Sequence, residues 1–184
     1  RAVALGLFDY MRKTRSNGYV VSLSGGADSS AVACLIALSL RFARAEMGPA
    51  LFSKTLEYLD NAVIADENAT DKEIINQLLV CVYQATRNSG EVTYNAAQHL
   101  ATALGSEFHR WEIDDIVCSY RSLIEESQGR KLTWERDDIT LQNIQARARA
   151  PSIWMLANMR SALLVATSNR SEAAVGYATM DGDT

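Results

Sequence analysis

The run Ser24-Gly25-Gly26-Ala27-Asp28-Ser29-Ser30 is the segment of this sequence best suited to hold phosphate oxygens. Its two glycines let the backbone approach a ligand closely and turn N–H groups toward it. Its serines add hydroxyl donors. Asp28 is the anomaly, because a carboxylate repels a phosphate, and a Mg²⁺ ion between the two would remove the repulsion. The run therefore predicts a site for a metal-bridged phosphate chain.

Other readings of the same run stay open at this point. A plain turn with Asp28 as a helix N-cap needs no ligand at all. The sequence contains no GxxxxGK[ST] pattern and no GxGxxG pattern. A Walker-type kinase site and a dinucleotide-binding Rossmann site are therefore not supported.

The elements on either side of the run favour the phosphate interpretation. Residues 19–23 are apolar and β-branched, which predicts a buried strand of a parallel sheet. Residues 29–40 lack Gly and Pro and are rich in Ala and Leu, which predicts a helix. The run would then lie between the end of a strand and the start of a helix, where the helix dipole and unpaired N–H groups attract anions.

The rest of the chain alternates between helical and strand patterns. Further strands are expected at 80–83, 108–113 and 163–167, and helices at 2–13, 71–79, 93–104, 114–128, 140–150 and 153–161. Thr70 and Glu73 form a capping-box pattern, Gly105 and Gly129 are expected to end helices, and 134–138 is expected to be loop. The alternation predicts an α/β fold, a doubly wound parallel sheet with helices on both faces, in a single domain spanning 1–184. Since the chain starts at Arg1 and stops just after a Gly-rich turn, we expect a fragment of a longer protein.

Composition limits the classes of binding partner and the cellular location that are expected. The chain has 184 residues and a net charge of −4, with acids and bases interspersed, so no basic face for nucleic acid or membrane is expected. No apolar run is long enough to span a bilayer. Cys34, Cys81 and Cys118 are scattered and form no CxxC pair, which favours buried structural thiols and a cytoplasmic location.

Polar segments at the expected strand ends could form a ligand site together with the Ser24–Ser30 run. Residues 81–89 leave a strand and enter a polar loop, and ligands of doubly wound sheets bind beyond the carboxyl ends of strands.

SGGADSS matches the Ser-Gly-Gly-x-Asp-Ser signature of the pyrophosphatase-loop ATP enzymes. Residues 143–149 (Asn-Ile-Gln-Ala-Arg-Ala-Arg) and 169–177 (Asn-Arg-Ser-Glu, then Gly-Tyr) resemble NAD⁺ synthetase, particularly the synthetase domain of the glutamine-dependent kind. The resemblance covers about residues 2–183 and implies the adenine nucleotide alpha-hydrolase-like fold.

The resemblance implies a reaction in two steps. The carboxylate of nicotinic acid adenine dinucleotide attacks the α-phosphate of ATP, with Mg²⁺ present, and ammonia then displaces AMP to give NAD⁺. The ammonia could come from glutamine, but the sequence shows no glutaminase, which would have to lie outside these residues. Kinship also implies a homo-oligomer. Another pyrophosphatase-loop ligase, such as GMP synthetase, and a non-catalytic adenine-nucleotide-binding module remain as alternatives.

The resemblance also implies roles for particular residues. Those expected to contact ATP are Ser24, Gly25, Gly26, Asp28, Ser29 and Thr167, with Asp28 and Glu172 as the Mg²⁺ carboxylates. Arg147, Asn143 and Asp183 are expected to bind substrate, and Arg170, where the family commonly has Lys, joins Asp28 as a catalytic residue. Simpler readings exist for some of them. Arg147 and Arg149 could line a solvated helix face, and Glu172 could pair with a helix dipole.

Overall fold

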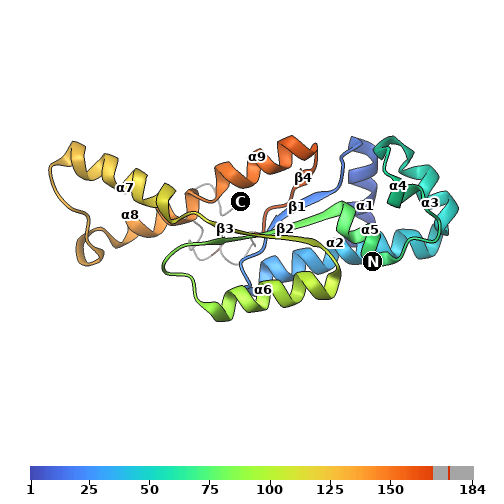
Figure 1. The fold of residues 1–184 in the computed structure, drawn as a ribbon, viewed down its shortest axis with the longest axis horizontal. Coiled ribbons are helices and arrows are strands. Elements are labelled where there is room, and N and C mark those ends of the chain that lie inside the picture. The colour runs from blue at the N-terminus through green and yellow to red at the C-terminus, as the bar shows by residue number, and fades with distance from the viewer. Residues whose placement is uncertain (168–173, 175–184) are drawn as a thin grey trace.

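The computed structural model describes residues 1–167 and 174. Its strands are β1 (Tyr19–Ser22), β2 (Leu79–Ala85), β3 (Glu107–Glu112) and β4 (Leu163–Leu164). Its helices are α1 (Ala2–Thr14), α2 (Ala27–Met47), α3 (Pro49–Thr55), α4 (Ala62–Ala65), α5 (Asp71–Leu78), α6 (Glu91–Leu104), α7 (Asp114–Gln128), α8 (Trp134–Arg147) and α9 (Ala150–Arg160), with the 3-10 helix η1 (Glu57–Leu59) between α3 and α4. Figure 1 shows α2 and α6 below the strands and α9 above them.

The described residues form one parallel sheet with the strand order β3-β2-β1-β4. Val20 of β1 lies opposite Val80 of β2, and Cys81 of β2 lies opposite Phe108 of β3. The first two strands along the chain are therefore the central pair, and β2 is buried along its whole length. Parallel strands buried on both faces have the continuous apolar sequence seen at 79–83.

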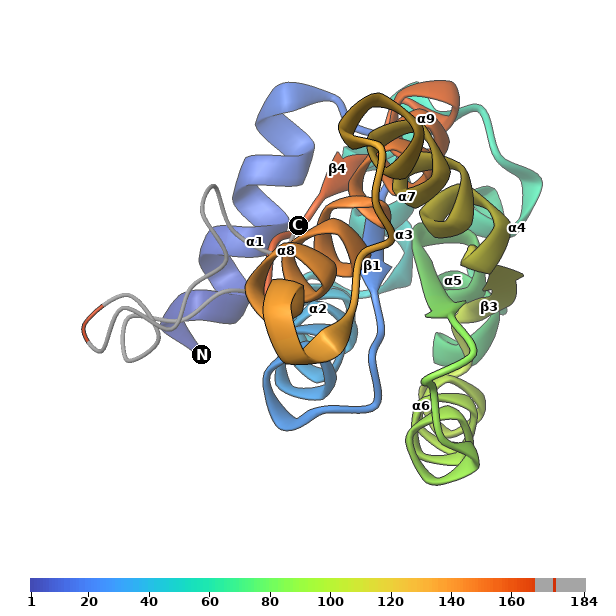
Figure 2. The same ribbon diagram turned by 90° about the vertical axis from the view of Figure 1, so that its left-hand side faces the viewer.

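The two faces of the sheet contribute to two separate apolar clusters. Tyr19, Val21 and Leu23 point to the face covered by α1, α2 and α6, whereas Val20 points to the face covered by Ile153 of α9. Because side chains alternate along a strand, one short run of apolar residues serves both clusters. Helices on both faces of a parallel sheet confirm the predicted fold class, and Figure 2 shows the same layers from the side.

Some predicted bounds were wrong. The helix expected at 29–40 runs from Ala27 to Met47, where Gly48 and Pro49 end it and start α3. The loop expected at 134–138 is instead the first turn of α8, whose backbone departs from helical geometry at Asp137. The strand expected at 163–167 is paired only at Leu163 and Leu164, opposite the first two residues of β1.

The α7–α8 hairpin extends beyond the sheet (Figure 1), and charged side chains fix its turn. Glu125, which is buried, accepts hydrogen bonds from Lys131 Nζ (2.8 Å), Arg121 Nε (2.8 Å) and the Leu132 backbone (2.9 Å). Lys131, Arg121 and that backbone N–H lower the pKa of Glu125 to about 2. Within the described part of the chain, no helix has both the length and the apolar character needed to cross a bilayer.

Candidate functional site

The glycine- and serine-rich loop follows β1 directly and is held by its own hydroxyl groups. Ser24 Oγ accepts a hydrogen bond from the Gly26 backbone at 3.2 Å and lies 3.0 Å from Ser29 Oγ. Ser29 is buried at the start of α2, where its hydroxyl also accepts from the Ser24 backbone and donates to the Gly26 carbonyl. The shape of the loop is thus set by hydrogen bonds among residues that were predicted to contact ATP.

Gly25 is required at its position for two reasons. Its φ of +80° is a conformation that side-chain-bearing residues rarely adopt. A Cβ atom added there would also lie 2.2 Å from the carbonyl oxygen of Thr93, in the first turn of α6. The loop therefore packs directly against α6, and the hydroxyl of Thr93 in turn lies 2.8 Å from the hydroxyl of Tyr83 on β2. This contact fixes the distance between the loop and the end of β2.

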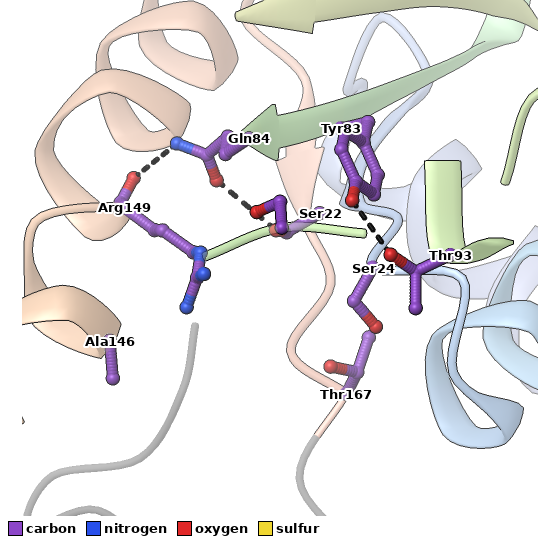
Figure 3. A pocket seen from close by; sticks show the side chains of 9 residues that line it. Ser22, Ser24, Tyr83, Gln84, Thr93, Ala146, Arg149 and Thr167 are labelled. Atoms are coloured by element: carbon purple, nitrogen blue, oxygen red, sulfur yellow. Dashed lines mark hydrogen bonds between the residues drawn. The ribbon is translucent and has the colours of Figure 1, made fainter. Parts of the chain in front are cut away.

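A cavity of about 220 Å³ opens beside this loop. Figure 3 shows side chains from β1, β2, the loop and the start of α9 directed toward it, and its walls include Ser22, Ser24, Tyr83, Gln84, Arg149 and Thr167. Ser22 is the last residue of β1, and Gln84 is the last but one of β2. The cavity thus lies at the carboxyl ends of the two central strands, where ligands of this class of sheet bind.

The structure brings only some of the predicted site residues to this cavity. Ser24 and Thr167 line it. Gly25, Gly26 and Ser29 shape the loop beside it, and Asp28 is exposed in the first turn of α2. Asn143 and Arg147 lie on α8, and neither is among the described residues that line the cavity. Arg170, Glu172 and Asp183 lie outside the described residues.

Among the wall residues that sequence reasoning did not assign to the site, two matter most for the arguments below. Arg149, two positions after Arg147, supplies the guanidinium that lines the cavity. Within residues 1–167 and 174, no carboxylate forms an ion pair with it. Gln84 is the other, and it belongs to residues 81–89, the strand end that was expected to face a ligand, although no role was predicted for it.

The loop that follows β2 is held by an ion pair to the start of α7. Arg87 donates from Nε to Asp114 Oδ2 at 2.8 Å, and its backbone N–H donates to Asp114 Oδ1 at 3.1 Å. These contacts with Arg87 lower the pKa of Asp114 below its ordinary value. Ser89, which lines the cavity, belongs to the same loop, so the ion pair also holds this part of the cavity wall in place.

The residues fit a magnesium ion that is shared with a phosphate ligand. Among the described residues, no three His, Cys, Asp or Glu side chains gather as a preformed metal site. Mg²⁺ does not require one, because it is usually held by one or two carboxylates together with substrate phosphates and water. Asp28, at the N-terminus of the helix that follows the loop, is a carboxylate of that kind.

A glycine- and serine-rich loop between β1 and α2, beside a polar cavity with an arginine, is the arrangement typical of α/β nucleotide-binding domains. Comparison with known proteins gives the family. The family model described as NAD synthase matches residues 1–184, so the chain belongs to the NAD synthase family.

Individual relatives agree with this assignment. The chain is 33% identical to the glutamine-dependent NAD(+) synthetase of Oryza sativa subsp. indica, over 94% of this chain and 26% of that protein. It is also 33% identical to the Aquifex aeolicus protein of the same name, over 99% of this chain and 25% of that one. The chain therefore spans about a quarter of the length of the curated relatives it matches.

A solved structure shows how far the likeness extends in space. The crystal structure of a glutamine-dependent NAD(+) synthetase from Cytophaga hutchinsonii superposes with a TM-score of 0.89 at 50% identity, covering 99% of this chain and 32% of that one. The Acinetobacter baumannii enzyme, solved in complex with ADP, has a TM-score of 0.71 at 24% identity over 98% of this chain and 27% of that one, which shows the shared fold.

Proposed function

We propose that this chain is the ATP-using part of an NAD⁺ synthetase. In the proposed reaction, a carboxylate oxygen of nicotinic acid adenine dinucleotide bonds to the α-phosphorus of ATP and pyrophosphate leaves. Ammonia then attacks the activated carbonyl carbon, AMP leaves, and loss of a proton gives the amide of NAD⁺. The observation that carries the proposal is the Ser24–Ser30 loop beside a polar cavity at the carboxyl ends of the central strands, in a chain of this family.

The residues of the cavity address the charge problem of the first step, in which two anions must meet. The loop N–H groups and the start of α2 offer fixed donors to the β- and γ-phosphates, and such preorganised donors are effective because they need no reorganisation during the reaction. Ser24 and Thr167 supply hydroxyl groups to the cavity, and Arg149 supplies a positive charge. We assign these residues to binding and orienting ATP.

Mg²⁺ would be held by Asp28 and, from outside the described residues, Glu172. When bound, the ion would neutralise phosphate charge and help pyrophosphate to leave. Asp28 contributes a hard oxygen ligand and belongs to the helix turn that the loop positions. Asn143, Arg147 and Asp183 are assigned to the dinucleotide, and Arg170 to the reacting phosphate, from the family resemblance.

The nitrogen donor is free ammonia or ammonia released from glutamine by another part of the whole protein. The curated relatives are named as glutamine-dependent, and this chain matches about a quarter of each. Feeding the whole protein either ammonium or glutamine distinguishes the two sources. A cytoplasmic location stays a prediction from cysteine content.

We also propose that the chain assembles as a homo-oligomer. Helices α7 and α9 expose large apolar side chains, among them Tyr120, Leu123, Ile124, Trp154, Met155 and Met159. Several large apolar side chains exposed on two helices are typical of an interface. Sedimentation equilibrium of the whole protein measures its assembly state, and a monomer at micromolar concentration would contradict the proposal.

The activity is tested directly. The whole protein is incubated with nicotinic acid adenine dinucleotide, ATP, Mg²⁺ and either ammonium or glutamine, and the products are separated. NAD⁺, AMP and pyrophosphate are expected, whereas ADP in place of AMP would refute adenylation. The variant Asp28→Asn should lose Mg²⁺-dependent turnover and keep its fold by circular dichroism, since Asp28 is exposed. Unchanged turnover would refute the metal assignment.

A further inference from the structure

Gln84 is a buried amide whose hydrogen bonds join three parts of the fold. Its Nε2 donates to the Arg149 carbonyl oxygen at 2.8 Å and to Ser152 Oγ at 2.9 Å. Its Oε1 accepts a hydrogen bond from Ser22 Oγ at 3.2 Å. The residue is only 5% exposed, and a buried polar group of this kind is costly to disrupt because water does not replace its partners.

The main partner of Gln84 is the residue whose side chain enters the cavity. Arg149 lies between the end of α8 and the start of α9, where Ala148 caps the first helix and Arg149 itself precedes the second. Its carbonyl oxygen is held from the sheet by Gln84, and also by Ser152 Oγ at 3.2 Å. Figure 3 shows the Gln84 amide bonded to this carbonyl group while the Arg149 guanidinium extends toward the cavity.

We infer that Gln84 is a positioning residue, which fixes the Arg149 backbone so that the guanidinium meets the phosphate chain of ATP. The inference rests on the proposed function, since ATP is the ligand it invokes. A guanidinium on a long flexible side chain recognises phosphate strongly only when its backbone is held in place. In this site Gln84 supplies that support from β2, the strand whose carboxyl end forms the cavity wall.

A purely structural role for Gln84 makes a different prediction. If the amide only filled the junction between the sheet and α9, its removal would lower stability and leave ATP affinity per folded molecule unchanged. The two roles are separated by a double-mutant cycle, because coupling between two residues appears as non-additivity. The variants are Gln84→Met, which keeps the length of the side chain and removes its hydrogen bonds, Arg149→Ala, and the two combined.

The measurement is calorimetric binding of ATP with Mg²⁺ to the whole protein, with the folded fraction followed by circular dichroism. Arg149→Ala should weaken binding about tenfold or more, the range expected for hydrogen bonds to charged groups. Gln84→Met should weaken binding severalfold, and the double variant should bind no more weakly than Arg149→Ala alone. Ser106→Ala is the matched control, because it removes a buried hydrogen bond, to the Ala101 carbonyl oxygen, that involves neither Gln84 nor Arg149, and its affinity should stay within about twofold of wild type.

Each other outcome contradicts the inference. Two results would show that Gln84 does not act through Arg149. One is wild-type ATP affinity in Gln84→Met. The other is an equal loss of affinity on Gln84→Met in the wild type and in Arg149→Ala. Wild-type affinity in Arg149→Ala would remove the partner on which the inference depends. None of these results bears on the proposed activity, which product formation by the wild-type protein decides separately. If Gln84→Met fails to fold, Gln84→Glu replaces it, because a carboxylate cannot donate to the Arg149 carbonyl oxygen.

Discussion

Replacing Gly25 with alanine should disable the phosphate-binding loop while the rest of the molecule stays folded. The positive φ of this residue costs a side-chain-bearing residue about 1–2 kcal/mol. The new Cβ would lie 2.2 Å from the Thr93 carbonyl oxygen, whereas Cβ contacts below 3.0 Å essentially never occur. The loop and α6 must therefore separate by about 0.8 Å, and a misplacement of that order costs roughly 100-fold in rate when it affects bound reactants.

The assay for Gly25→Ala combines thermal unfolding with steady-state kinetics of AMP formation. We expect a modest fall in melting temperature and a loss of about 100-fold in kcat/KM for ATP. Gly105→Ala is the control for backbone strain, because Gly105 also has a positive φ but its Cβ would meet Lys72, away from the cavity. Gly6→Ala controls for the added methyl group, since nothing lies within 4 Å of that position. Wild-type kcat/KM in Gly25→Ala would refute the proposed contact between the loop and α6.

Three further predictions concern regions outside the cavity. Because the folded-state pKa of Glu125, about 2, lies below its ordinary 4.5, its ion pairs should stabilise the α7–α8 hairpin above pH 4.5 and be lost as pH falls toward 2. Thermal unfolding of Glu125→Gln across pH 2–7 should therefore show a weaker acid dependence than wild type. Thr70→Ala removes the capping box and should lower the free energy of unfolding, measured with urea, by about 1 kcal/mol. Thr133→Ala should lower it by less, because Thr133 makes no side-chain cap hydrogen bond. Burial raises the pKa of Cys81 to about 11, so iodoacetamide at pH 8 should label the partly exposed Cys118 before Cys81. Mass spectrometry follows the labelling, and equal labelling rates for the two thiols in the native protein would contradict this prediction.

Local signals in the sequence predicted much of the fold. The capping box at Thr70 and Glu73 is present, with Glu73 accepting from the Thr70 backbone at 2.7 Å. Gly105 and Gly129 end α6 and α7 in the left-handed conformation, as expected. These features depend on residues within a few positions of one another, which is why sequence patterns predict them.

Features that depend on distant residues were harder to predict. The cysteines illustrate this, because Cys81 is fully buried on β2 whereas Cys34 and Cys118 are only partly buried. The expectation of a buried thiol is confirmed for Cys81 and was wrong for the other two. The first turn of α8 was also missed. Asp137, where the backbone departs from helical geometry, is held by Arg130 at 2.7 and 2.8 Å and by the Thr133 backbone. The conformation of this polar segment therefore depends on contacts with residues that precede it.

The choice between Arg147 and Arg149 shows most clearly what the sequence leaves undetermined. Successive helical residues are about 100° apart, so two residues separated by two positions point to nearly opposite sides of a helix. The pattern Arg-Ala-Arg therefore predicts that one arginine faces the cavity and the other does not, without saying which. The structure breaks the helix between them at Ala148, and Gln84, 65 residues earlier in the chain, binds the carbonyl group of Arg149. The residue that selects the cavity arginine is thus on a different element from either candidate, and only the packing of α9 against the sheet brings it within hydrogen-bonding distance.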